Sequence, residues 1–83
     1  MGYTIRRWFS ISEMQFDDSS KVKTSEEAIK ESLRLAGICR SLINEDIKNR
    51  IIELKDGEVV RIKKPSLKFT MIIRKTKRYE WSD

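Results

Sequence analysis

Apolar side chains recur at every second position near the start of the chain, and this alternation predicts a strand. The apolar positions are Tyr3, Ile5, Phe9 and Ile11, and the polar side of residues 3–12 carries Thr4, Arg6, Trp8, Ser10 and Ser12. Successive side chains of a strand point to opposite faces, so one face is expected to be buried and the other exposed. Arg7 interrupts the apolar side. Trp8 is expected on the face opposite Phe9, beside Arg6.

The same alternation returns in residues 59–78. Leu67, Phe69, Met71 and Ile73 fall on one side of a strand, and Lys68, Thr70, Ile72 and Arg74 fall on the other. Pro65 cannot donate to a strand ladder, so it marks the turn into a last strand that begins near Leu67 and runs to Lys75. The stretch holds eight basic residues and no acidic one: Arg61, Lys63, Lys64, Lys68, Arg74, Lys75, Lys77 and Arg78.

A helix is predicted from Ser25 to about Ile43. Thr24 and Glu27 have the spacing of a capping box, and acidic residues crowd the first turn, where the helix dipole favours them. The apolar positions of this helix cover an arc much wider than the roughly 100° stripe of a helix that lies on one sheet. The arc therefore needs a second partner. That partner is either a long loop folded back or a second copy of the chain, which would make a homodimer through residues 25–43.

Two readings of residues 44–62 stay open. Ile47, Ile51 and Leu54 have helical spacing, which predicts a second short helix that closes at Gly57. The same stretch also fits a hairpin with Asp56 and Gly57 in a tight turn, because β-branched residues stand on both sides of the turn. The hairpin is favoured, since it places Ile52 and Leu54 on one apolar face with Val60 and Ile62.

Residues 15–23 are polar and rich in turn-forming residues, so they are expected to form the main loop of the protein. A short hairpin extension through Met14, Phe16 and Val22 is the alternative. Asp17 and Asp18 are adjacent, and adjacent acids in a loop are expected to be solvated. They supply fewer oxygen ligands than a hard cation needs.

These elements predict a single α+β domain over residues 1–83. The expected architecture is a four-stranded, mainly antiparallel sheet with one helix on one face, in the order β-α-β-β-β. The alternative order is β-α-α-β-β, with a short second helix at residues 45–55. In either case one face of the sheet stays uncovered.

The cysteine content and the lack of long apolar stretches indicate where the protein is expected to be located. The chain has one cysteine, Cys39, so it can form no internal disulfide, which fits a reducing compartment. Cys39 falls in the middle of the apolar arc and is expected to be a small core residue. No signal peptide or bilayer-spanning stretch is recognised, so a cytoplasmic location is expected.

An enzyme is not expected, and neither are catalytic residues, a metal site or a cofactor. The chain has no histidine, which is the commonest general base and metal ligand. Gly2, Gly37 and Gly57 are too far apart to form a glycine-rich phosphate loop.

The net charge of +5 and the basic last third indicate a binding protein. The favoured function is a protein-interaction module, an adaptor or inhibitor that docks on a larger acidic partner, with Tyr79 and Trp81 as further candidate anchors. The alternative is nucleic-acid binding, in which cations neutralise phosphates and Trp8 stacks on a base. A membrane partner is not expected. The candidate binding residues are Arg6, Trp8, Arg61, Lys63, Lys68, Arg74, Lys75, Lys77 and Arg78.

Overall fold

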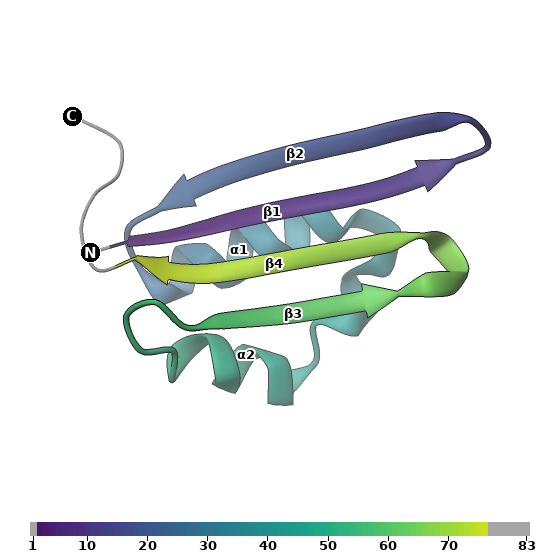
Figure 1. Ribbon diagram of the computed structural model, residues 1–83. Helices are drawn as coiled ribbons and strands as arrows, with labels where there is room; N and C mark the ends of the chain where they lie inside the picture. Colours follow the sequence, from purple (N-terminus) through teal and green to yellow (C-terminus); the bar gives the residue numbers. More distant parts are fainter. Residues whose placement is uncertain (1, 77–83) are drawn as a thin grey trace.

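The longest strand, β1 (Gly2–Ile11), lies inside an antiparallel sheet, between one strand that follows it directly and one from the far end of the chain. The computed structural model describes residues 2–76, and within them the sheet has the order β2-β1-β4-β3 (Figure 1). The other strands are β2 (Met14–Val22), β3 (Val59–Lys64) and β4 (Phe69–Thr76). The prediction of a small α+β protein with a four-stranded antiparallel sheet is confirmed.

The helices all lie on one face of this sheet, with α1 (Ser25–Ala36) behind the central strands and α2 (Glu45–Ile52) toward β3 (Figure 1). Two short 3₁₀ turns, η1 (Gly37–Leu42) and η2 (Pro65–Leu67), complete the described elements. Among residues 2–76 there is no helix with the length and apolar character needed to cross a membrane.

Of the two readings of residues 44–62, the structure has the second helix, and the favoured hairpin does not form. Asn44 caps α2, because its side chain accepts a hydrogen bond of 2.9 Å from the Ile47 amide. In the helix Ile51 is fully buried and Ile52 is 54% exposed, the reverse of the hairpin register. A cap and a 3.6-residue period outweighed the strand propensity of the β-branched residues here.

Residues 14–22 form the strand β2, so the main loop predicted over residues 15–23 was wrong in that stretch, and the alternative of a hairpin through Met14, Phe16 and Val22 is confirmed. The strand pairs with β1 without interruption from Ile11↔Met14 to Tyr3↔Val22. As an edge strand it is largely exposed, and its apolar residues stand mainly at its two ends, so its alternation is weak in the sequence.

The capping box of α1 is confirmed, since Thr24 accepts from the Glu27 amide and Glu27 accepts from the Thr24 amide. The α-helix ends earlier than predicted, at Gly37, which has a φ of +57°. Glycine adopts this left-handed conformation at little cost. The chain continues as η1, in which Ile38 is 88% exposed.

Apart from Ile38, which stays exposed, the wide apolar arc of residues 25–43 is shared between the sheet and α2 of the same chain, because α1 contacts both. The homodimer through residues 25–43 remains a prediction. The homodimer was predicted because the arc needs a second partner, and within the described residues α2 already supplies one.

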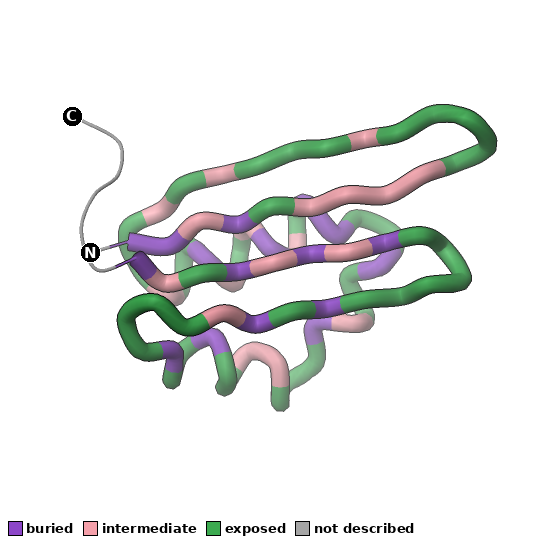
Figure 2. The backbone as a smooth tube through the Cα atoms, viewed as in Figure 1, coloured by how far each residue is buried: buried purple, intermediate pink, exposed green. Residues whose placement is uncertain are grey.

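The core lies between the sheet and the helices. Buried positions alternate along β1, β3 and β4 and face buried positions of the helical segments (Figure 2). Cys39 is buried in this core, as predicted. The largest fully buried side chains of the core are those of Ile5, Ile51, Met71, Ile73 and Ser32.

Alanine substitution of two neighbouring residues tests the helix at 45–52. Ile51→Ala should lower the free energy of unfolding by about 2–5 kcal/mol, because it removes a fully buried side chain and leaves a cavity. Ile52→Ala should change it by about 0.5 kcal/mol or less, since that side chain is largely exposed. Urea denaturation followed by circular dichroism measures both. A larger loss for Ile52→Ala would indicate the hairpin register instead.

Candidate functional site: the open face of the sheet

The face of the sheet opposite the helices is open to solvent, and the strand register fixes which side chains stand on it. Ile5 and Ile73 are opposite each other and fully buried on the helix side, so the residues that alternate with them point to the open side. Three rows cross the sheet from β3 through β4 and β1 to β2. The rows are Val59–Arg74–Thr4–Lys21, Arg61–Ile72–Arg6–Ser19 and Lys63–Thr70–Trp8–Asp17.

This open face is cationic. Arg61, Lys63 and Arg74 are exposed, and within residues 2–76 none of the three has a carboxylate partner. Half-buried Ile72 lies between Arg61 and Arg6, whose backbones are two strands, or about 10 Å, apart. The face therefore has apolar surface at its centre and positive charge beside it.

Trp8, Arg6 and Asp17 form one cluster on this face. The Arg6 guanidinium lies over the Trp8 ring, with Cζ 4.6 Å from the ring centroid. It also donates to both carboxylate oxygens of Asp17, from Nε at 3.2 Å and from Nη2 at 2.8 Å. These hydrogen bonds lower the pKa of the Asp17 carboxyl below its ordinary value and raise that of Arg6. Trp8 is thus partly covered by the Arg6 guanidinium, whose charge is paired with the Asp17 carboxylate.

The other predicted binding residues do not all join this face. Lys68 has a left-handed backbone, with a φ of +49°, and caps η2 in the turn before β4. Lys75 alternates with Arg74 and stands on the helix side, where its Nζ lies 5.8 Å from the centroid of the Tyr3 ring. Lys77 and Arg78 lie outside the described residues, as do Tyr79 and Trp81. Arg6, Trp8, Arg61, Lys63 and Arg74 are brought together.

Arg7, which had no role in the sequence prediction, occupies the helix side between β1 and α1. Its Nη1 donates to the Leu35 carbonyl at 2.8 Å, near the C-terminal end of α1, and its Nη2 pairs with Asp18. Its Cζ also lies 4.8 Å from the centroid of the Phe9 ring. Its Nε is buried and has no acceptor. The lone charge in an apolar alternation was the only sequence signal, because both partners come from other elements.

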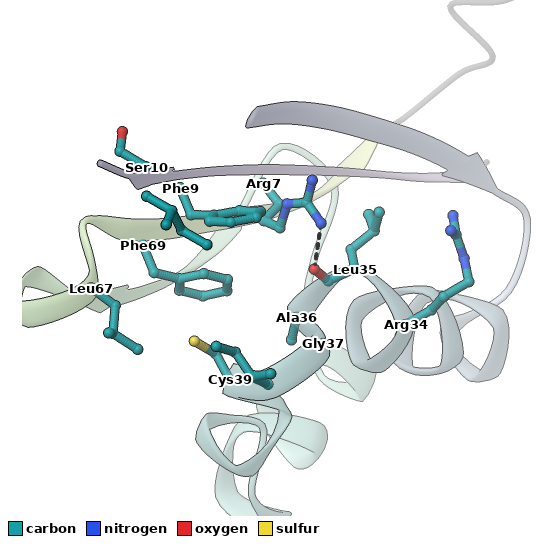
Figure 3. A pocket seen from close by; sticks show the side chains of 12 residues that line it. Arg7, Phe9, Ser10, Arg34, Leu35, Ala36, Gly37, Cys39, Leu67 and Phe69 are labelled. Atoms are coloured by element: carbon teal, nitrogen blue, oxygen red, sulfur yellow. Dashed lines mark hydrogen bonds between the residues drawn. The ribbon is translucent and has the colours of Figure 1, made fainter. Parts of the chain in front are cut away.

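Beside Arg7, at the end of the sheet where the two hairpins turn, lies a groove of about 490 Å³. Phe9, Phe69, Cys39 and Leu67 converge on the space between the sheet and η1 (Figure 3). The lining is mostly apolar, and among residues 2–76 its charged side chains are Arg7, which pairs with Asp18, and Arg34, which pairs with Glu31.

Among residues 2–76 no group of three or more His, Cys, Asp or Glu side chains is placed to hold a metal ion. Comparison of the chain with protein-family models, with curated proteins and with solved structures finds no match.

The cluster on the open face is tested by the pKa of Asp17. Because that pKa is lowered in the folded protein, the Arg6–Asp17 pair favours the folded state at neutral pH, and this contribution is lost as the pH falls through the folded-state pKa. In Arg6→Gln the Asp17 pKa should rise toward its ordinary value, as measured by NMR titration of the carboxyl carbon.

Arg61→Gln is the control for this titration, because Arg61 stands in the same row as Arg6 but on the far side of Ile72. It should leave the pKa of Asp17 unchanged. If Arg6→Gln also leaves it unchanged, the cluster does not form in solution.

Proposed function

We propose that the protein is a non-enzymatic binding module, an adaptor or inhibitor that docks on an acidic protein surface through the open face of its sheet. The observation that carries this proposal is the group Arg61, Lys63 and Arg74, three exposed cations on one face without carboxylate partners within residues 2–76. A surface lined by one sign of charge speeds encounter with an oppositely charged partner and selects against others.

The centre of the face suits a protein partner. Ile72 and Trp8 are half-buried, and cations from β3 and β4 stand beside them. Protein interfaces commonly combine an apolar centre with a polar rim, and tryptophan and arginine are enriched among the residues that contribute most binding energy. The single, buried cysteine is compatible with the cytoplasm, which is the location that we propose for this activity.

Nucleic acid is the second candidate, favoured by one observation: Trp8 and Lys63 share a row of the open face, separated only by Thr70. An aromatic ring beside a cation can bind a base and its phosphate. Two contacts weigh against it. Arg6 already lies over the Trp8 ring, and the Asp17 carboxylate beside it would repel a phosphate. An acidic protein is therefore the favoured partner.

Reversal of the charges on the open face tests the proposal. In the variant Arg61→Glu, Lys63→Glu, Arg74→Glu, binding to the partner captured by the wild-type chain should weaken at least tenfold, because attraction becomes repulsion. The control variant Lys30→Glu, Arg40→Glu, Arg50→Glu reverses three exposed charges on the helical segments and should keep wild-type affinity. Affinity is measured by calorimetry with the purified partner.

Capture with and without nuclease decides the class of partner. A stoichiometric protein that survives nuclease supports the proposal, whereas loss of the captured material with nuclease supports the nucleic-acid candidate. In that case affinity should also fall with salt, with a slope of about −2 in a plot of log K against log salt for three phosphate contacts with a single strand. Equal loss of binding in both charge variants would contradict a role for this face.

A further inference from the structure

Strand β2 forms one edge of the sheet, and no further strand of residues 2–76 pairs with its outer side (Figure 1). Its nine residues pair with β1 in unbroken register and include no proline. Short length, bulges and prolines are features that keep an edge strand from pairing with another chain. The opposite edge has such features, because β3 has six residues and is followed directly by Pro65. Strand β2 is therefore the edge that can accept a further strand.

Alternate residues of β2 direct their backbone hydrogen-bonding groups away from the sheet. The Lys75 amide donates to the Glu58 carbonyl at 3.2 Å, so odd-numbered residues of β4 bond toward β3 and even-numbered ones toward β1. The registers carry this alternation through β1 to β2, whose even-numbered residues bond toward β1. The residues that face outward are Gln15, Asp17, Ser19 and Lys21, all of them exposed. Their amides and carbonyls form the row on which a further strand can pair.

The sequence of β2 is complementary to itself in one antiparallel register. Opposite residues of paired strands point to the same face, so a two-fold axis between two β2 strands lies at the position of one residue and not between two residues. With the axis at Ser19, Asp17 lies opposite Lys21 of the second copy, on the open side. Phe16 then lies opposite Val22 of the second copy, on the helix side. Pairs of opposite charge and apolar pairs both stabilise a sheet.

Other positions of the axis lose these pairs. An axis at Asp17 or at Asp18 places that carboxylate directly opposite its own copy, which destabilises a sheet. An axis at Ser20 places Asp18 opposite Val22 and shortens the paired stretch. Register is specified where one choice matches the pattern of the strand and the others do not. The sequence of β2 therefore selects the axis at Ser19.

We propose that the β2 strands of two copies pair antiparallel about a two-fold axis at Ser19, which joins two sheets into one. The pair that Asp17 already forms with Arg6 is compatible with this contact. Arg6 donates once to each carboxylate oxygen of Asp17, and a carboxylate has about four acceptor positions, so Lys21 of the second copy can donate as well. A second copy is the occupant that the observations favour, because the complementary strand is β2 itself.

The helices leave room for this pairing. The axis is perpendicular to the sheet, so the α1 helices of both copies lie on the same side. Each α1 lies behind the central strands, and the two β1 strands are three strand spacings, or about 14 Å, apart in the dimer. Helices pack at about 8–10 Å, so the two α1 helices do not overlap.

The contact lies outside the group Arg61, Lys63 and Arg74 that carries the proposed function, because those residues are in β3 and β4. In the dimer the open faces of both copies form one surface, with this group toward each end. The inference therefore goes beyond the proposed function and does not depend on it.

The first test places a cysteine at the proposed axis. In Ser19→Cys the two introduced residues are opposite each other, with their Cα atoms about 5.5 Å apart, a distance that a disulfide spans. Oxidised glutathione should therefore convert this variant into a covalent dimer, measured by non-reducing electrophoresis. Cys39 is buried and should not compete.

Gln15→Cys is the matched control, because Gln15 is exposed on the same edge and the same face. In the proposed register the two copies of residue 15 are eight strand steps, or about 26 Å, apart. This variant should cross-link at least tenfold more slowly than Ser19→Cys. Equal rates in the two variants would overturn the register and the proposal with it.

The second test is sedimentation velocity over a range of protein concentrations. The wild-type chain should self-associate to a dimer and no further as its concentration rises. Ser19→Pro removes an outward amide that β1 does not use, so it should weaken this association at least tenfold. Ser19→Ala keeps the amide and should associate as the wild type does. Circular dichroism checks that both variants fold, and if Ser19→Pro does not, the cross-linking rates decide.

Three results of sedimentation would contradict the proposal. One is a monomer at every concentration, and another is association that a folded Ser19→Pro variant leaves unchanged. Assemblies larger than a dimer would indicate that β2 pairs head-to-tail with β3 of the next copy instead. The charge-reversed variant at Arg61, Lys63 and Arg74 should still dimerise, so failure of this inference and failure of the proposed function are distinguishable.

Discussion

The position of β2 and β3 at opposite edges of the sheet is the constraint on which the rest of the structure depends. The chain leaves β2 at one edge and must reach β3 at the other, and all of the helical residues between them lie in that single crossing. One crossing passes over one face. The apolar sides of β1, β3 and β4 are consequently covered by α1 and α2, and the other face of the sheet has no helix from residues 2–76 to cover it.

This constraint gives the two faces of the sheet different roles, with the core on the covered face and charged residues on the open one. On the covered side, alternate residues supply the core, and Arg7 is accommodated there because Leu35 and Asp18 accept its hydrogen bonds. On the open side, burial places no demand on the alternate residues, and β3 and β4 place cations there. The crossing also leaves a groove where η1 and the turn before β4 meet the end of β1. The lining of this groove shares no residue with the cations of the open face.

The parts of this arrangement that depend on local periodicity could be predicted from the sequence. The alternation in residues 3–12 and 67–75 placed Trp8, Arg6 and Arg74 on a common face, and the spacing of Thr24 and Glu27 located the start of α1. What failed depended on contacts between distant residues. The polar strand β2 is stabilised by pairing with β1, and its own weak alternation of polar and apolar residues does not predict that pairing.

Local pattern was also insufficient for residues 44–62, because their β-branched side chains fit either a helix or a hairpin. Packing of Ile51 against the core with Ile52 exposed, together with the cap at Asn44, decides for the helix. The candidate site was predicted in part. Lys68 was placed on this face by extending the alternation back to Leu67, but β4 begins at Phe69 and Lys68 is a left-handed turn residue. Lys75 was included for its charge, and the alternation of β4 directs it to the helix side.

The one-sided cover of the sheet is tested most directly by a soluble paramagnetic probe, which broadens the NMR signals of side chains that solvent reaches. Ile72 and Ile73 are neighbours in β4 that point to opposite faces, so their methyl signals form an internal comparison. The structure predicts strong broadening for Ile72 and for the side chains of Arg61 and Lys63, with Ile73 and Met71 protected. Equal protection of Ile72 and Ile73 would contradict an open face, and with it the binding surface proposed there.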